Sequence, residues 1–426
     1  MMSWSVRFRL RQYAKASLWI VPMIGLLLGA AFAEWVSGVD AGFLPGDWRY
    51  SATTASGVLS AVVGAMVALL GFVVTIGVLV IQQATGTLSP RYMRLWYRDR
   101  LQKAVLATFT GTFAYAFSLL RKIESDHVPD VGVTLSGVAV SVSLLLLLVY
   151  LNRFTHNLRP VAIAELVGRM GERVVVRSAD HLRRSLAAEG VSVPPAGPVT
   201  GVETARGGVL QAFDAAGLVE AAVRHDCVLV LTCHVGDYVP PGTALVEVYG
   251  AERNPDPRRV TGLVALGAER TIEQDPGFAL RILVDIAIRA LSPAVNDPTT
   301  AVQVLNHIDS FLHAIGRVRL RDGYVLADGR GLPRLVVPGR GWDDYLQLGV
   351  TEIREYGSTS LQVCRRLRAL LQDLLRSQPS EHLPAVRAEL ALLDEAVGRA
   401  FADPVRRADA RTADRQGIGT GRRPER

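Results

Sequence analysis

Four long apolar stretches in the first 152 residues constrain the fold of this chain more than any other feature. They cover about residues 16–35, 57–81, 104–120 and 131–151. A helix needs roughly 20 mostly apolar residues to cross the hydrocarbon core of a bilayer. The backbone of such a segment must satisfy its own hydrogen bonds, and a helix does so. We therefore predict a transmembrane domain of four helices at residues 16–152, with the lipid bilayer as its first partner.

The charges of the connecting segments predict how these spans are oriented. Arginine and lysine are concentrated before the first span, between the second and the third, and after the fourth, whereas the other two loops are mainly acidic. Basic loops remain on the cytoplasmic side of a membrane. We therefore expect both termini, and all residues after about 152, in the cytoplasm. This distribution accounts for much of the formal net charge of +7, so a nucleic-acid partner is not expected.

The second span carries a ladder of small residues. Its members are Gly57, Ser60, Gly64, Ala68 and Gly71. Small residues allow helix backbones to approach closely in lipid. Two interpretations stay open: packing inside one four-helix unit, or packing around the shared axis of a homo-oligomer, where the ladder lines a pore. The span contains no Asp, Glu, Lys, Arg or His, which disfavours a proton relay or a charged coupling site within it.

The remaining residues divide by composition into further segments. They are a basic cytoplasmic N-terminus (1–15), an interfacial helix (about 89–101), a helical stalk and linker (153–200), a small β domain (201–265), a cytoplasmic helical domain (266–402) and a disordered basic tail (403–426). Short β-type runs separated by Gly, Pro and Asp indicate the strands of the β domain. A hairpin is expected at 319–338, one long helix at about 342–378, and another at about 381–401.

A stretch of the β domain suggests its shape. "HVGDYVPPGTALVEV", at residues 234–248, resembles the turn of the biotinyl- and lipoyl-type barrel-sandwich domains. Such carriers present a modifiable lysine, and no lysine occurs in this region. The resemblance therefore implies the shape and not the carrier activity. The predicted fold class is a membrane protein with a four-helix transmembrane domain, followed by an α+β cytoplasmic domain that contains a small β-sandwich or barrel-like unit and a helical C-terminal region.

The sequence offers little support for a metal site or for catalysis. The three cysteines, Cys227, Cys233 and Cys364, form no CxxC pair, which favours reduced thiols. Cys233 and His234 lie near Asp237, but no second cluster of ligands accompanies them. No nucleophile elbow, Walker A loop, HExxH or dinucleotide fingerprint occurs. We expect no enzymatic activity, no cofactor and no metal.

The helix expected at about residues 276–292 is apolar on almost every side. Its exceptions are Arg281, Asp285 and Arg289, spaced four residues apart, so they share one stripe. A helix that is apolar on its other faces is buried, and buried charges are costly unless they are paired. The stripe is therefore either a salt-bridged seam or a network that meets an anionic ligand or a neighbouring subunit.

Two Asp-Pro pairs flank this helix and predict the starts of two helices. Aspartate is a favoured N-cap, and proline is favoured at the first helical position, as in Asp275-Pro276 and Asp297-Pro298. Helix N-termini also attract anions. The candidate polar or anion site comprises Arg270, Glu273, Arg281, Asp285, Arg289, Asn296, Asp297, Thr299, Thr300 and His307. A histidine such as His307 is more often structural than functional.

Three stretches of the chain resemble a known family. They are "LSPRYMRLWYRDR" from residue 88, "RTIEQDPGFALRILVDIAIRALSPAVNDPTTAV" from residue 270, and "VTEIREYG" from residue 350. Together they are similar to DUF2254, a bacterial family of predicted membrane proteins, over most of the chain. The resemblance implies a multi-pass protein of the bacterial plasma (inner) membrane. The family name denotes a domain of unknown function, so it implies no mechanism and no catalytic residue.

Two hypotheses of function follow from these features. The first is a homo-oligomeric channel or transport-related protein with a cytoplasmic regulatory domain. The alternative is a membrane-anchored binding or regulatory module that senses an anionic small molecule near Arg270, Arg281, Arg289 and the helix start at Asp297. The first depends on the small-residue ladder, and the second depends on the polar stripe.

Overall fold

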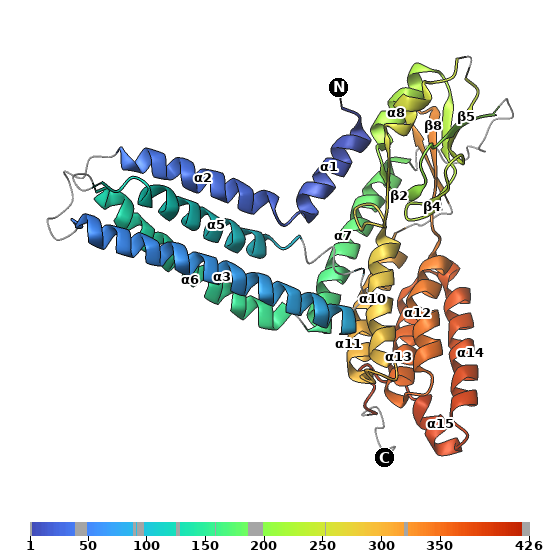
Figure 1. The fold of residues 1–426 in the computed structure, drawn as a ribbon. Helices are drawn as coiled ribbons and strands as arrows, with labels where there is room; N and C mark the ends of the chain where they lie inside the picture. Colours follow the sequence, from blue (N-terminus) through green and yellow to red (C-terminus); the bar gives the residue numbers. More distant parts are fainter. Residues whose placement is uncertain are drawn as a thin grey trace. The chain divides into compact units, whose positions relative to one another are not determined.

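The computed structural model describes residues 2–38, 49–87, 91, 98–124, 128–157, 159–185, 199–251, 253–318 and 323–419. The chain forms two compact units (Figure 1). Residues 12–159 make up the four-helix unit, and residues 1–11 with 160–426 make up the C-terminal unit. Helix α1 (Trp4–Ala16) contributes residues to both.

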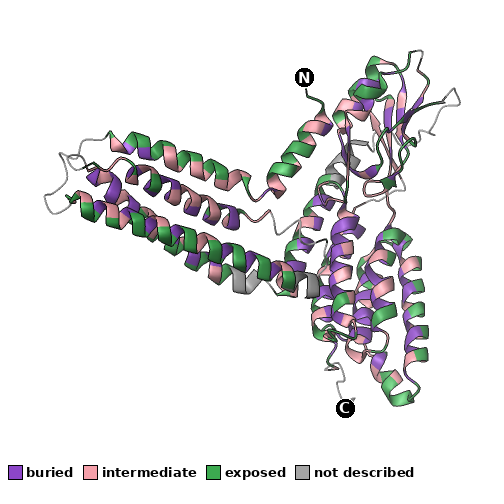
Figure 2. Ribbon diagram, in the orientation of Figure 1, coloured by how far each residue is buried: buried purple, intermediate pink, exposed green. Residues whose placement is uncertain are grey.

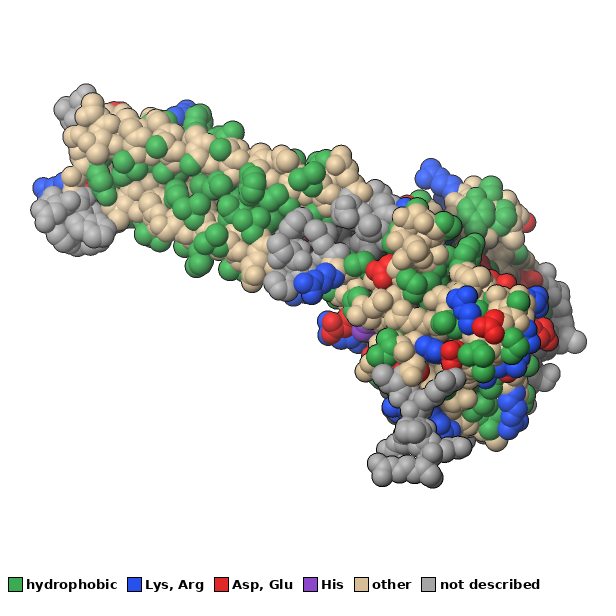
Figure 3. All heavy atoms as spheres, turned by 90° about the horizontal axis from the view of Figure 1, so that it is seen from below, with side chains coloured by type: hydrophobic (Ala, Val, Ile, Leu, Met, Phe, Trp, Pro, Cys, Tyr) green, Lys and Arg blue, Asp and Glu red, His purple; other side chains and the backbone are tan. Residues whose placement is uncertain are grey.

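The four-helix unit consists of the predicted apolar helices. They are α2 (Ile20–Ser37), α3 (Ala52–Thr87), α5 (Arg100–Leu120) and α6 (Asp130–Asn157). Each is long and apolar enough to cross a bilayer, over Ile20–Ser37, Ala52–Gln82, Arg100–Leu120 and Asp130–Arg153. Hydrophobic side chains cover much of this unit, whereas charged side chains gather over the C-terminal unit (Figure 3). The four predicted spans are therefore confirmed as four apolar helices.

Helix α5 lies at the centre of this unit and packs against α2, α3 and α6. Its buried Leu119 lies in one apolar cluster with Leu59 and Met66 of α3. Its buried Phe109 lies in a second cluster with Val73 of α3. Several polar groups inside the unit are paired with one another. The Tyr115 hydroxyl, for example, donates to the carbonyl oxygen of Gly132 at 3.1 Å. Since apolar surroundings leave such groups no water, pairing removes the cost of burying them.

The C-terminal unit contains two small sheets. The strands are β1 (Val199–Glu203), β2 (Gly208–Phe213), β3 (Val228–Leu231), β4 (Tyr238–Val239), β5 (Ala244–Tyr249), β6 (Val264–Gly267), β7 (Gly323–Ala327) and β8 (Pro333–Pro338). One sheet has the order β1-β5-β3-β8-β7, and the other has the order β4-β2-β6. The β3–β8 pair is parallel, and the other pairs are antiparallel. Both sheets share one apolar core with α8 (Ala215–Arg224) and α9 (Pro257–Thr261).

This arrangement refines the predicted β domain of residues 201–265. The predicted hairpin forms as β7 and β8, but it joins the same sheet as β3 through parallel pairing of Leu229 with Leu335. Strand β1 begins at Val199, inside the segment predicted as linker. Helix α8 was not predicted; Asp214 caps it by accepting a hydrogen bond from the backbone N–H of Gly217 at 3.1 Å. The architecture is therefore two sheets of five and three strands with a shared core.

The rest of the C-terminal unit is helical. Its helices are α7 (Pro160–Ser185), α10 (Pro276–Leu291), α11 (Pro298–Gly316), α12 (Trp342–Gly357), α13 (Leu361–Ser377), α14 (Leu383–Ala400) and α15 (Pro404–Ala410). Helix α10 packs against α7, α11 and α12, and ten of its 16 residues are buried (Figure 2). The predictions of a buried helix and of both Asp-Pro starts are confirmed. Asp275 and Asp297 each accept from the backbone N–H three residues later, at 3.0 Å.

Two predictions for this region are wrong. The single helix at 342–378 is in fact α12 and α13, because Ser360 caps α13 and Gly357 packs closely on Val363. A Cβ at Gly357 would lie 2.5 Å from Val363 Cγ1. The tail predicted to be disordered from residue 403 is ordered as far as residue 419, because Asp403 caps α15 and Arg365 of α13 donates to the carbonyl oxygen of Asp409 at 2.8 Å.

Parts of two further predictions lie outside the described residues. Residues 420–426 of the tail belong there, as does most of the interfacial helix expected at 89–101.

Candidate functional site

The small-residue stripe of α3, defined as Gly57, Ser60, Gly64, Ala68 and Gly71, is exposed along its whole length. Each residue of a helix advances by about 100°. The stripe therefore lies on the side of α3 opposite to its buried residues, such as Leu59, Met66 and Val73. A Cβ added at Gly57, Gly64 or Gly71 would meet no atom within 4 Å. Within one protomer, these glycines are not needed for close packing.

A second set of small residues, which sequence reasoning missed, packs α2 against α5. A Cβ at Gly29 would lie 2.1 Å from the carbonyl oxygen of Gly111, and one at Gly25 would lie 2.3 Å from that of Ala107. The Thr110 hydroxyl donates to the carbonyl oxygen of Pro22 at 2.9 Å in the same contact. The signal was present as Gly25-xxx-Gly29 and Ala107-xxx-Gly111, the spacing typical of close helix pairs in lipid.

The predicted polar stripe forms a seam between α10 and α12. Arg281 Nε donates to Asp285 Oδ1 at 2.8 Å, and its Nη2 donates to Glu352 Oε2 at 2.9 Å. Its Nη1 binds the other oxygen of Glu352. The hydrogen bonds that Arg281 donates to Glu352, followed by the charge of Asp285, raise the pKa of Arg281 despite partial burial. All three nitrogens of Arg281 therefore meet carboxylates. The decisive partner, Glu352, is 71 residues away in sequence and was missed.

The other predicted residues do not gather around this seam. Arg270 Nε donates to Asp275 Oδ2 at 2.8 Å at the start of α10, and its guanidinium lies over the Phe278 ring. Asp297 lies beyond the other end of α10 and caps α11. A helix of 16 residues is about 24 Å long, so Arg270 and Asp297 cannot share one small ligand.

Five of the predicted residues lie at the end of α10, at the start of α11 or in the corner between them. Asn296 adopts a left-handed conformation with φ +48. The Thr300 hydroxyl donates to Asp297 Oδ2 at 2.6 Å, and Thr299 lies 3.5 Å from Gln362. Arg289 is exposed in the last turn of α10. Capping and turn geometry therefore account for most of this corner.

His307 and Glu273 lie elsewhere in the C-terminal unit. His307 faces Gly168 of α7, and desolvation lowers the pKa of its imidazole, opposed by the charges of Glu165 and Glu172. Glu273 lines the cavity described below. The candidate residues are thus distributed over several places rather than one site.

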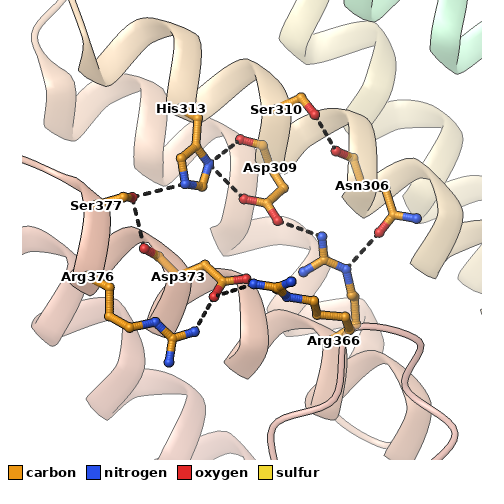
Figure 4. A network of polar contacts seen from close by, with 9 residues as sticks. Asn306, Asp309, Ser310, His313, Arg366, Asp373, Arg376 and Ser377 are labelled. Carbon is orange, nitrogen blue, oxygen red and sulfur yellow. Dashed lines mark hydrogen bonds and ion pairs between the residues drawn. The ribbon is translucent and has the colours of Figure 1, made fainter.

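A polar network between α11 and α13 was also missed by sequence reasoning (Figure 4). Arg366, which is buried, donates from Nε to Asn306 Oδ1 at 2.8 Å and from Nη2 to Asp309 Oδ2 at 2.7 Å. The network borders an open groove of about 730 Å³. Arg415, from the segment predicted to be disordered, donates to Asp373 at 3.1 Å. No local pattern predicted this network, because its residues are far apart in the sequence.

A cavity of about 290 Å³ lies between the sheets and the helices of the C-terminal unit. Its apolar wall includes Val174 and Val175 of α7, Phe213 of β2, Ile315 of α11 and Leu326 of β7. Small-molecule sites are usually concave, mostly apolar and supplied with a few polar groups, from roughly 300 Å³ upward. The cavity is therefore the best-formed candidate binding site among the described residues.

The polar wall of the cavity includes His234 and Arg340. Asp237 Oδ2 lies 3.1 Å from His234 Nδ1, and the carbonyl oxygen of Gly339 lies 3.1 Å from Nε2. Arg340 Nη2 donates to Asp237 Oδ1 at 3.1 Å. Asp237 thus anchors both side chains, and both ring nitrogens of His234 are already used by the protein.

Asp275 and Tyr345 complete the polar wall. Burial raises the pKa of Asp275, and the neighbouring Arg270 guanidinium opposes this effect. Gly236 approaches this pair so closely, with φ +100, that a Cβ there would lie 2.4 Å from Asp275 Oδ2. Burial also raises the pKa of Tyr345, so its hydroxyl remains protonated. The residues come from four separate segments, so sequence spacing gave no sign of the cavity.

No group of three or more His, Cys, Asp or Glu side chains that could hold a metal occurs among the described residues. The three cysteines are free thiols. Burial raises the pKa of each thiol to about 11, which keeps them protonated and unreactive.

One family model matches most of the chain. DUF2254, described as a predicted membrane protein, matches residues 15–373. An uncharacterized protein of Mycobacterium bovis is 32% identical over 417 residues, which span 93% of this chain and 79% of the relative. An uncharacterized protein of Mycobacterium tuberculosis matches with the same identity and coverage. No solved structure matches. The chain therefore belongs to the DUF2254 family of predicted membrane proteins.

Proposed function

We propose that the protein is a homo-oligomer of the channel or transport class in the bacterial plasma (inner) membrane, with the small-residue stripe of α3 at the contact between copies. The observation that carries this proposal is the exposure of Gly57, Gly64 and Gly71 on a face of α3 that meets none of the other described residues of the protomer. Helices associate in lipid through small residues, because lipid gives apolar side chains no hydrophobic reason to pair.

The composition of the stripe favours a shared axis. No ionisable residue lies along α3 between Ala52 and Gln82. An axis lined by such helices is narrow and weakly polar, and a pore of that kind opens and closes by wetting rather than by the movement of a fixed charge. The C-terminal unit then lies in the cytoplasm, as the basic loops predict, and serves as a regulatory domain.

Cysteine cross-linking in native membranes tests the contact between copies. Gly64→Cys is introduced into full-length protein in which the partly exposed Cys233 is replaced by serine; the buried Cys227 and Cys364 are retained. We expect rapid oxidation to a cross-linked dimer. Leu145→Cys is the matched control, because Leu145 is 62% exposed on α6, away from the stripe. Equal cross-linking at both positions, or none at Gly64, would contradict the proposed contact.

Transport is tested separately after reconstitution. Proteoliposomes are assayed for ion conductance and for release of small solutes under voltage and osmotic shock. We expect flux from the parent protein and reduced flux after stripe substitutions. If the protein forms an oligomer but gives no flux, the proposed contact between copies would stand, and the channel or transport class would be excluded.

The alternative, a membrane-anchored module that senses an anionic small molecule, loses its predicted site at Arg281, because carboxylates occupy that guanidinium. The cavity of the C-terminal unit is the place where a sensing role can be examined.

A further inference from the structure

The cavity of the C-terminal unit has one buried polar group that the protein leaves unused. Tyr345 is only 5% exposed, and it lines the cavity. Its hydroxyl forms no hydrogen bond with any of the described residues. Buried tyrosine hydroxyls ordinarily find a partner. The unpaired hydroxyl of a buried tyrosine that lines a cavity therefore points to a group that occupies the cavity.

Arg340 supplies a second donor at the same end of the cavity. Among the described residues, only its Nη2 is hydrogen-bonded, to Asp237 Oδ1. Nε and Nη1 remain available to a ligand. Arg340 and Tyr345 both line the cavity. A guanidinium with two available nitrogens matches the geometry of a carboxylate.

The acceptors at this end are already engaged. Asp275 accepts from Arg270 through Oδ2 and from the backbone N–H of Phe278 through Oδ1. Asp237 accepts from His234 and Arg340. Arg340 and Tyr345 therefore present hydrogen-bond donors beside carboxylates that already bind other groups, which favours a ligand that brings acceptor oxygens. The apolar wall of the cavity, which includes Val174, Phe213 and Leu326, favours a ligand with an apolar body.

We propose that this cavity binds a small monocarboxylate with an apolar body, whose carboxylate is held by Arg340 and the Tyr345 hydroxyl and whose body lies against the apolar wall. A cavity of about 290 Å³ suits a molecule of the size of an aromatic or short aliphatic acid. The proposal gives the regulatory domain of the proposed function a ligand. It does not depend on oligomerisation, because every residue of the site belongs to the C-terminal unit of one protomer.

Titration calorimetry on the full-length protein in lipid nanodiscs tests the site with three probes. Phenylacetate carries both a body and a carboxylate, phenethyl alcohol carries the body alone, and acetate carries the carboxylate alone. We expect measurable binding of phenylacetate and at least tenfold weaker binding of the other two. Binding of the alcohol as tight as that of the acid, or no binding of phenylacetate, would overturn the proposal.

Two substitutions connect binding to the named residues. Tyr345→Phe removes one hydroxyl that has no protein partner, so folding is retained and phenylacetate affinity falls about tenfold. Tyr356→Phe is the matched control, because Tyr356 is exposed on the same helix. Arg340→Gln lowers affinity at least tenfold, and Arg340→Lys restores part of it. Unchanged affinity in both Tyr345→Phe and Arg340→Gln would overturn the assignment. Cross-linking at Gly64 stays unaffected in each case, which separates failure of this site from failure of the oligomer.

Discussion

Two sets of small residues in the four-helix unit have opposite surroundings. Gly25 and Gly29 of α2 lie against the backbone of α5, where an added methyl group has no room. Gly57, Gly64 and Gly71 of α3 face away from the protomer, where an added methyl group meets nothing. The presence of small residues alone therefore does not show whether two helices pack together at that point. Their role is decided by what covers them, and only one of the two sets is covered within the chain.

The largest expected effect comes from substitution in the covered set. Gly29→Val places a Cβ 2.1 Å from the carbonyl oxygen of Gly111, and backbone cannot move aside as a flexible side chain can. Overpacking a core typically costs about 1–3 kcal/mol and occasionally more. We expect the upper end of this range, with little folded protein recovered. Thermal unfolding in detergent measures the loss, and Gly64→Val is the control. A Gly29→Val protein as stable as its parent would show that α2 and α5 do not meet at these glycines.

The second prediction concerns the exposed set. Gly64→Leu leaves the protomer folded, because the site is open and leucine favours a helix by up to about 1 kcal/mol over glycine. We expect the oligomer to dissociate, because bulk on the stripe keeps the copies of α3 apart. Mass photometry in nanodiscs reports the number of copies. Val74→Leu, which enlarges an exposed residue beside the stripe, should leave assembly intact. A parent protein that is already monomeric would remove the basis of the proposed function.

Local sequence was sufficient for features that depend on neighbouring residues. Four apolar helices, both Asp-Pro helix starts and the buried character of α10 could be predicted, because periodicity and capping act within a few residues. The pairing of β3 with β8 and the contact of Arg281 with Glu352 could not, because each joins segments about 70 or more residues apart. The cavity was missed for the same reason. No local pattern in the sequence indicates that its polar residues form one site, because only the fold brings them together.

Gly25 and Gly29 show a different limit of sequence reasoning. Their spacing is visible in the sequence, but the stripe on α3 is the longer and more obvious pattern. Composition alone does not show which of two small-residue faces packs against another helix of the same protomer. That choice is made by the packing of α5, which has Ala107 and Gly111 in register with α2 and presents larger side chains, such as Phe109, to its other neighbours.

The smallest expected effect concerns Asp373 in the C-terminal unit. Its carboxyl contacts Arg415 of the segment that was predicted to be disordered. Burial works against ionisation of Asp373, but hydrogen bonds from Arg415 and Arg376 outweigh it and hold the pKa of its carboxyl below the ordinary value. A carboxyl with a lowered pKa in the folded state stabilises the fold fully above its unfolded pKa of about 3.9, and this contribution is lost as the pH falls through the folded value. Because Arg415 is largely exposed, solvent limits the gain to about 1 kcal/mol or less.

Asp373→Asn should therefore unfold at a lower temperature than the parent near neutral pH. The difference should narrow as the pH falls below about 4, because the parent loses the same contribution when Asp373 becomes protonated. Thermal unfolding across this range measures the gap, and Asp403→Asn, which alters a helix cap in the same segment without an arginine partner at its side chain, is the comparison. A gap that stays constant with pH would mean that Arg415 does not cover Asp373. The order of residues 403–419 would then depend on the other contacts of this segment, such as the Asp403 cap of α15, the contacts of Arg365 and the ion pair of Arg411 with Asp394.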